Sequence, residues 1–213
     1  MLLAVLLMQI PLSAAAQTAP DAIRYTLSFL APQTHYLEVS AVVPTDSRPE
    51  VELMMAVWTP GSYLIREYSR NVESVTATGQ GGRVLAIEKS DKNRWRVTTG
   101  GAPSVTVKYR VYAREMSVRT NWVEADFAMI NGAPTFMTLV GGLQRPHEVV
   151  IEPARGWRTS ITSLAPLSGG SHRYRAVDYD DALTHQRFER MEIFDGHGGG
   201  ELNCSSRARQ GTN

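Results

Sequence analysis

Short runs in which apolar and polar residues alternate follow one another along most of the chain. The clearest is 105–112, where Val and Tyr residues alternate with Thr, Lys and Arg. A period of two predicts strands that have one buried face and one exposed face. On this pattern, strands are expected at 23–29, 36–43, 51–58, 84–88, 95–98, 105–112, 127–130, 135–140, 149–152 and 174–177.

Turn-forming residues separate these runs, as in the Gly- and Pro-rich stretches 78–82 and 100–103. Asn131-Gly132 lies between two apolar runs and predicts a tight hairpin. No segment keeps a helical period, which argues against a βαβ nucleotide-binding fold. The expected fold class is therefore all-β: a β-sandwich of short antiparallel strands.

The two ends of the chain differ from this body. Residues 1–12 are almost wholly apolar, and small residues follow, so 1–16 is expected to be a signal peptide cleaved after Ala16. A buried N-terminal helix or strand is the alternative, although Pro11 would interrupt it. The signal peptide would place the protein in the periplasm or outside the cell, with the sandwich at 17–182.

The last part of the chain, 183–213, is expected to be an irregular and flexible tail. Strand-like alternation stops there, and the final residues are rich in Gly, Ser and Arg. Leu183, Phe188, Met191 and Phe194 are spaced as if along one face of a short helix.

Charge and cysteine content remove several classes of function. The 213 residues include 22 Lys and Arg against 21 Asp and Glu, a formal net charge of +1. Because positive and negative charges nearly balance, the chain has no general attraction to nucleic acid or to an anionic membrane. Neither is expected as a partner, apart from the contact that the signal peptide itself makes with a membrane. The single Cys excludes an internal disulfide framework and a zinc site built on several thiolates.

Catalytic motifs are missing. His147-Glu148 begins like the helical zinc motif His-Glu-x-x-His, but Ile151 stands where the second His is needed. The β-branched residues that follow favour a strand, so His147 is expected to be an ordinary residue at the edge of a strand and not a ligand. The acidic run 178–181 could bind Ca²⁺ but lacks the other features of a calcium loop, and a solvated loop is expected. Neither a cofactor, a metal ligand nor a catalytic residue is assigned to this chain.

Two polar segments are the candidates for binding a ligand or a partner domain. In the first, 58–68, a Pro-Gly turn follows a strand and could present its polar side chains to a ligand or a partner domain. In the second, 114–124, charged residues and an indole follow the clearest strand. Polar loops that only cap the end of the sandwich are the alternative. The candidate substrate-facing or interdomain residues are Tyr63, Arg66, Glu67, Tyr68, Arg119, Asn121 and Trp122.

These segments carry a resemblance to a known family. The block Trp-Thr-Pro-Gly-Ser-Tyr-Leu-Ile-Arg-Glu-Tyr at 58–68 is the most specific part, and 25–29, 92–97, 109–122, 131–136 and 178–180 belong to it too. Over about 21–181, the sequence closely resembles the N-terminal domain of the glycyl aminopeptidase family of zinc metallopeptidases (peptidase family M, number sixty-one).

The resemblance implies a β-sandwich that precedes a thermolysin-like catalytic domain, and often a PDZ domain, in enzymes that remove small N-terminal residues such as glycine. The sandwich would pack on the catalytic domain and help to wall the active-site cleft. The zinc ligands and the general-base Glu lie in the catalytic domain and have no matching position here. Zinc is therefore expected only in that domain, and this chain alone is expected not to be an enzyme.

Family-like sequence stops just after Asp181. The chain is accordingly expected to be a fragment whose main partner is a missing catalytic domain, with peptides as further ligands; a frameshift would produce such an end, which the encoding DNA would show. One alternative is a free-standing secreted β-sandwich that binds a peptide or glycan through Tyr63, Trp95 or Trp122. A zinc hydrolase with an unrecognised site is the remaining possibility.

Overall fold

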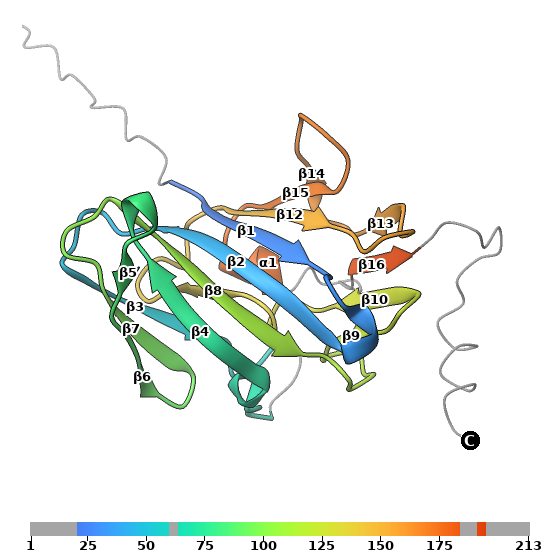
Figure 1. Cartoon of the computed structure of the whole chain (residues 1–213). Coiled ribbons are helices and arrows are strands. Elements are labelled where there is room, and N and C mark those ends of the chain that lie inside the picture. The colour runs from blue at the N-terminus through green and yellow to red at the C-terminus, as the bar shows by residue number, and fades with distance from the viewer. Residues whose placement is uncertain (1–20, 60–63, 184–190, 195–213) are drawn as a thin grey trace, which may run out of the picture.

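A large twisted sheet forms one layer of the molecule. The computed structural model describes residues 21–59, 64–183 and 191–194. Eight strands lie side by side in this sheet (Figure 1). Their order is β14 (Ala165–Pro166), β15 (Arg173–Ala176), β12 (His147–Glu152), β1 (Ile23–Ser28), β2 (Tyr36–Pro44), β8 (Ser104–Tyr112), β4 (Val72–Thr78) and β5 (Val84–Leu85).

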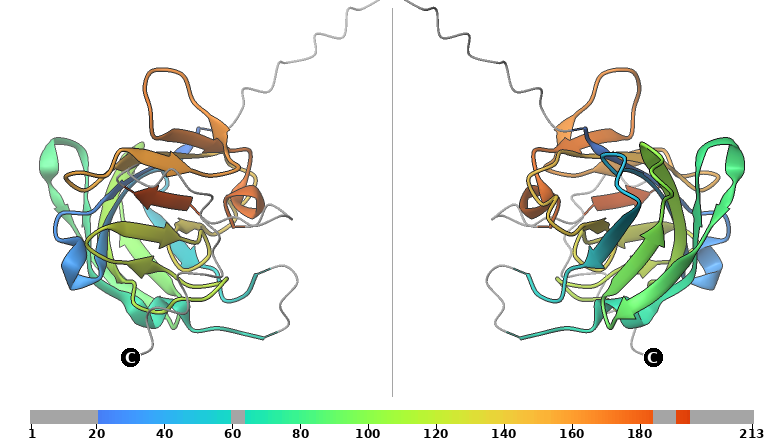
Figure 2. Two further views of the ribbon diagram at one scale, coloured as in Figure 1. Left: turned by 90° about the vertical axis from the view of Figure 1, so that its right-hand side faces the viewer. Right: turned by 90° about the vertical axis from the view of Figure 1, so that its left-hand side faces the viewer.

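Two smaller sheets complete the sandwich and lie within the curve of the large one (Figure 2). One has the order β11 (Met137–Leu139), β3 (Glu50–Met55), β7 (Arg94–Thr98) and β6 (Ile87–Asp91). The other has the order β13 (Thr159–Ile161), β16 (Met191–Phe194), β10 (Phe127–Ile130) and β9 (Trp122–Val123). The helices among the described residues are short: η1 (Pro32–Thr34), η2 (Tyr68–Asn71), η3 (Gln80–Gly82) and α1 (Tyr179–Leu183).

The predicted all-β sandwich is confirmed, with one difference in strand direction. β1 pairs in parallel with β12, whereas β1 and β2 are antiparallel like the other neighbours in this sheet. Parallel pairing needs a long connection between the two strands, and more than a hundred residues separate these two. Alternation within one run of sequence does not reveal the direction of so distant a partner.

Tyrosines bridge the two layers of the core. Tyr25 on β1 and Tyr109 on β8 are fully buried, and their hydroxyls donate to the backbone carbonyls of Met137 (2.7 Å) and Thr135 (2.8 Å). Tyr179 on α1 donates to the carbonyl between them, that of Phe136, at 2.9 Å. A buried carbonyl without a partner is costly, so these phenols hold the 135–137 segment in place from three directions.

The hairpin predicted at Asn131-Gly132 is wrong. β10 before it pairs with β9 and β16, and β11 after it pairs with β3. Gly132 is needed for a close approach: a Cβ there would lie 1.9 Å from the backbone oxygen of Ala182. The Asn-Gly pair therefore packs against the end of α1 and does not reverse the chain between two paired strands.

The acidic run at 178–181 starts a helix, so the solvated loop predicted there is wrong. The Asp178 carboxylate accepts from the backbone N–H of Asp181 at 2.8 Å, and the Asp181 carboxylate accepts from that of Val177 at 2.8 Å. This arrangement is a variant of the capping box, in which the second bond goes to the residue before the N-cap. The helical face proposed for Leu183, Phe188, Met191 and Phe194 is also wrong where it can be seen, because 191–194 form β16; Phe188 lies outside the described residues.

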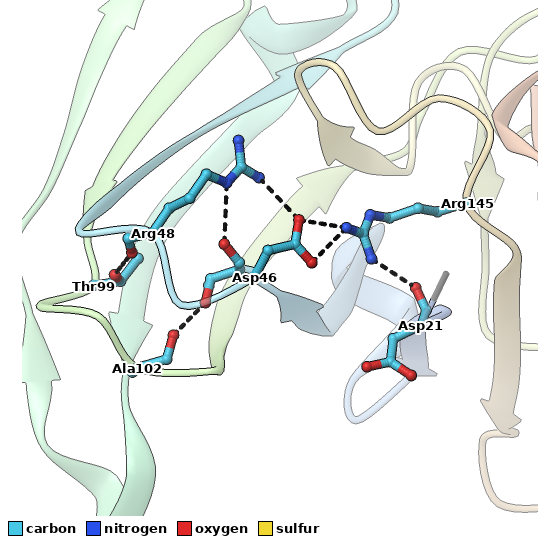
Figure 3. A network of polar contacts seen from close by, with 7 residues as sticks. Asp21, Asp46, Arg48, Thr99, Ala102 and Arg145 are labelled. Carbon is cyan, nitrogen blue, oxygen red and sulfur yellow. Dashed lines mark hydrogen bonds and ion pairs between the residues drawn. The ribbon is translucent and has the colours of Figure 1, made fainter. Parts of the chain in front are cut away.

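An ion-pair network fastens the turn between β2 and β3 (Figure 3). The guanidinium of Arg145 donates to both carboxylate oxygens of Asp46, at 2.7 and 2.5 Å, and to the backbone oxygen of Asp21 at 3.2 Å. Arg48 adds a longer contact of 3.8 Å to the same carboxylate. Arg145 therefore connects this turn to the start of β1 and to the segment that leads into β12.

The predicted signal peptide at 1–16 and most of the predicted tail at 183–213 lie outside the described residues. Among the described residues, no helix has the length and apolar character to cross a membrane.

Candidate functional site

Two segments that are distant in sequence form the walls of a cavity at one end of the sandwich. One wall is 64–71, which ends in η2, and the other is part of the loop after β8. The cavity has a volume of about 430 Å³, within the usual size of small-ligand sites. We call it cavity A; it is lined by Leu64, Ile65, Arg66, Glu67, Tyr68, Arg70, Asn71, Glu115 and Thr120.

The 64–71 wall is held at its base by the backbone. The N–H of Arg66 donates to the carbonyl of Val57 at 2.6 Å, which closes the connection that leaves β3. Ser69, which is buried, donates to the carbonyl of Lys92 at 2.7 Å and so ties η2 to the turn between β6 and β7. The described ends of the connection project from the sandwich (Figure 2), whereas its base is fixed by these bonds.

The opposite wall is a closed loop with its own internal bonds. The N–H of Glu115 donates to the carbonyl of Asn121 at 3.2 Å, and the Thr120 hydroxyl bonds both the Glu115 carbonyl and the Ser117 hydroxyl. The N–H of Arg119 donates to the Ser117 hydroxyl at 3.1 Å. The loop is therefore shaped by its own polar groups, and the Asn131 amide adds a bond to the Thr120 carbonyl from outside it.

Charges around cavity A are only partly neutralised. Glu67 pairs with Lys92 at 3.2 Å, and Glu115 pairs with Arg70 at 3.4 Å. All four side chains are more than half exposed, so each pair adds little stability. Arg66 also lines the cavity and has no ion pair with any described residue.

Tyr68 is a buried polar residue of the cavity, with 4% of its surface exposed. Burial raises its pKa, whereas the charges of Arg66 and Arg119 and the nearby Thr59 hydroxyl lower it. Thr59 does not reach it with normal hydrogen-bond geometry, and the Tyr68 hydroxyl has no hydrogen bond to any described residue. The phenol thus stays neutral at physiological pH and keeps a free donor.

A second hollow, cavity B, lies on the other side of the same wall, with a volume of about 520 Å³. Ile65, Arg66, Glu67 and Arg70 line both cavities. The rest of the lining of cavity B comes from Val57, Ser69, Lys89, Asp91, Lys92 and Asn93. The 65–70 stretch is therefore a ridge with a hollow on each flank.

The residues proposed from the sequence as substrate-facing or interdomain residues lie in different parts of the structure. Arg66, Glu67 and Tyr68 line cavity A, and Arg119 lies near Tyr68. Tyr63 lies outside the described residues. Asn121 is buried: its amide donates to the Thr135 hydroxyl at 2.8 Å and accepts from the backbone of Asn131 at 2.7 Å, so it acts within the fold.

The tryptophans proposed for ligand binding are mostly covered. Trp95 is 3% exposed, and Lys89 lies over its ring at 5.3 Å. Trp122 is half-buried beneath the guanidinium of Arg114, and its enclosed indole N–H has no hydrogen-bond partner among the described residues. The list of candidate residues left out Arg70, Asn71 and Glu115 of cavity A. Glu115 lies in the candidate segment 114–124, whereas the only signal for the other two was their position directly after the 58–68 block.

The described residues contain no group of three or more His, Cys, Asp or Glu side chains placed to bind a metal ion. His147 lies in a strand as predicted, but it is fully buried and not at an edge, because β12 lies between β1 and β15. Its Nδ1 contacts the Arg145 carbonyl at 2.8 Å and its Nε2 the Thr138 hydroxyl at 3.0 Å. Both nitrogens are used, so the residues do not fit zinc at this position.

One Ser–His contact invites a comparison with hydrolases. The Ser160 hydroxyl lies 2.7 Å from Nδ1 of His172 and 2.5 Å from the Tyr174 hydroxyl. No described carboxylate bonds the imidazole, and the serine is tied to a second partner. A nucleophile needs a base that a further group orients, so this contact is a structural link between β13 and β15.

Comparison with known proteins identifies the family to which this domain belongs. Residues 24–185 match the family described as the Peptidase M61 N-terminal domain. The chain belongs to this family. The resemblance found in the sequence is thereby confirmed over nearly the expected range.

The M61 N-terminal domain is also similar to parts of solved structures. An aminopeptidase N family protein from Idiomarina loihiensis is 27% identical, with a TM-score of 0.73 over 81% of this chain. This chain spans 29% of the length of that protein. An M1 zinc metallopeptidase from Deinococcus radiodurans is 12% identical, with a TM-score of 0.41. The match covers 83% of this chain and 38% of the metallopeptidase. A search of the curated proteins found no match.

Proposed function

We propose that this chain serves as the non-catalytic N-terminal domain of a secreted or periplasmic zinc metallopeptidase of the glycyl aminopeptidase kind. The observation that carries the proposal is the family match over residues 24–185. The Idiomarina protein supports it, since this chain corresponds to 29% of that aminopeptidase N family member. The role of the domain would be to pack on the catalytic domain and shape the cleft that receives the peptide.

The surface at cavity A supports this role. Leu64, Ile65 and Val118 are 62%, 75% and 68% exposed, and all three belong to the walls of the cavity or to the loop that forms one of them. Large apolar side chains gathered on one surface are typical of a protein contact. We place the interdomain contact at this end of the sandwich.

The alternative proposal, a free-standing module that binds a peptide or glycan, has less support. Trp95 is buried in the core, and Trp122 is half-covered by Arg114, so neither offers an open aromatic platform for a sugar. Cavity A could still receive a peptide within either proposal.

Metal analysis and a peptidase assay test the proposal on the purified 213-residue chain. We expect less than stoichiometric zinc and no release of p-nitroaniline from Gly- or Ala-p-nitroanilide. One equivalent of zinc together with turnover that a chelator abolishes would replace the proposal with a complete hydrolase. Mass spectrometry of the exported protein tests the location, because cleavage after Ala16 would leave Gln17 as the first residue.

A further inference from the structure

Enclosed polar atoms without partners gather near cavity A. They are Nε of Arg66, the hydroxyl of Tyr68 and, at the end of the loop that forms the opposite wall, the indole N–H of Trp122. Each is a hydrogen-bond donor, and none has a partner among the described residues. Elsewhere the buried phenols of Tyr25 and Tyr109 are fully bonded. The Nε of Arg173 on β15 is a further enclosed donor without a partner among the described residues, but cavity A is where two such donors line one hollow.

The same region carries uncompensated positive charge. The two carboxylates of the cavity, Glu67 and Glu115, are occupied by Lys92 and Arg70. Arg66 in the cavity and Arg119 beside Tyr68 have no ion pair with any described residue. Free N–H and O–H donors with a positive charge are suited to an anion that accepts several hydrogen bonds.

We propose that cavity A binds the carboxylate of a short peptide, with the Arg66 guanidinium and the Tyr68 hydroxyl as its donors and Arg119 as a nearby positive charge. A guanidinium presents paired N–H groups whose spacing matches the two oxygens of a carboxylate. A neutral phenol beside it supplies a further donor.

The apolar rim favours a peptide over an inorganic anion. Leu64 and Ile65 line the cavity and are largely exposed, and the opposite loop carries the exposed Met116 and Val118. An apolar side chain next to the bound carboxylate can cover these residues, whereas phosphate offers them nothing. The carboxylate can come from a peptide C-terminus or from a Glu side chain, and the experiment below separates the two.

This inference goes beyond the proposed function, because it assigns a binding site to this domain itself. The site lies on the surface proposed above for the interdomain contact, so it is tested on the chain by itself, where no catalytic domain covers that surface. Absence of peptide binding would leave the interdomain role standing, and zinc-dependent turnover would leave the peptide site standing.

Titration of the full ¹⁵N-labelled chain with three peptides tests the proposal by NMR. The probes are acetyl-Ala-Leu-Leu with a free C-terminus, the same peptide as its C-terminal amide, and acetyl-Ala-Glu-Leu amide. We expect the free acid to bind at least about tenfold more tightly than its amide and to shift the indole N–H resonance of Trp122. If the Glu-containing amide binds at least as tightly as the free acid, the source is a side-chain carboxylate, which also supports the site.

Variants locate the binding. Arg66→Gln should weaken binding of the free acid by about tenfold, and Arg66→Lys should recover only part of this loss because lysine lacks the paired donors. Arg83→Gln removes an exposed charge that lines neither cavity and should change nothing. The proposal fails if neither carboxylate-bearing peptide binds more tightly than the leucine amide, if none of the peptides binds, or if inorganic phosphate binds more tightly than both carboxylate-bearing peptides. The comparison of acid with amide uses the unaltered chain and so decides the matter even if a variant does not fold.

Discussion

Acidification from neutral pH to pH 5 should destabilise the fold because folding keeps His147 neutral. Burial lowers the pKa of this side chain to about 4, from an ordinary value of 6.5, against smaller effects of the Arg145 carbonyl and Asp178 that raise it. The imidazole is packed between the rings of Tyr25 and Tyr179, at centroid distances of 5.7 and 5.3 Å. A charged imidazolium there would lack water.

The hydrogen bonds define the neutral form. A carbonyl can only accept, so Nδ1 carries the proton toward Arg145, and Nε2 accepts from the Thr138 hydroxyl. Protonation of Nε2 would remove the lone pair that Thr138 uses. The fold therefore holds one tautomer, and acid would turn Nε2 into a donor, so that the Thr138 hydroxyl would have to reverse its role and accept.

The magnitude and its sign follow from linkage. Between pH 6.5 and pH 4, the unfolded chain binds a proton at this site and the folded chain does not, so acidification favours unfolding. The stability from this residue is complete above about pH 7 and is lost as the pH falls toward 4. From pH 7.5 to pH 5.0 the free energy of unfolding should fall by about 2 kcal/mol on account of His147.

Urea unfolding followed by tryptophan fluorescence measures this loss. Other groups titrate over the same range, so the parent chain is compared with His147→Gln at both pH values. We expect the variant to be less stable at pH 7.5 but to lose about 2 kcal/mol less than the parent on going to pH 5.0. Equal losses in the two proteins would refute the assignment of a buried neutral imidazole.

Further predictions concern single contacts of the core. Tyr109→Phe should lower the free energy of unfolding by about 1–3 kcal/mol, because it leaves the buried carbonyl of Thr135 without its donor. Gly132→Ala should cost about 3 kcal/mol or prevent folding, since the new Cβ would meet the backbone oxygen of Ala182 at 1.9 Å. Asp178→Ala should cost about 1 kcal/mol by removing the cap of α1. Each is measured by urea unfolding at pH 7.5.

Matched variants control these measurements. Tyr112→Phe removes a phenol from a partly exposed ring and should be nearly neutral. Gly79→Ala places a Cβ at an ordinary 3.5 Å from a leucine side chain, so it should cost far less than the change at Gly132. Asp178→Asn keeps a capping oxygen and should retain most of the stability. A core variant no worse than its control would show that the contact in question does not hold the fold.

Strands with strong alternation could be predicted from sequence, whereas weakly patterned ones could not. The 105–112 run emerged as β8 with little change, because its buried and exposed faces alternate strictly. β4 (Val72–Thr78) was missed, since it carries a bulge between Glu73 and Thr76 and buries only Ala77 fully. Short strands such as β9 and β14 exist only through their partners, which local sequence does not specify.

Of the candidate site, the sequence indicated the residue types but not their arrangement. The density of Arg, Glu and Tyr pointed to 66–68, and the structure puts these residues in one cavity. The sequence could not show that Asn121, two residues after Arg119, turns inward to bond Thr135, because side chains in a loop do not alternate between buried and exposed positions with a fixed period. The capping box at Asp178 was readable from its spacing and was overlooked for lack of a longer helical pattern after it.

The contrast between core and cavity is the strongest argument for a function at cavity A. In the core, a polar side chain is retained only where it bonds a defined partner: Tyr179 spans the Phe136 carbonyl and the Ala56 N–H, and His147 uses both nitrogens. Against these bonded core groups, Arg66 and Tyr68 are enclosed side by side in one cavity without partners among the described residues, and each unbonded group costs free energy. That cost is recovered when an external acceptor binds, which is why we expect a ligand or a partner domain to supply the missing oxygen atoms there.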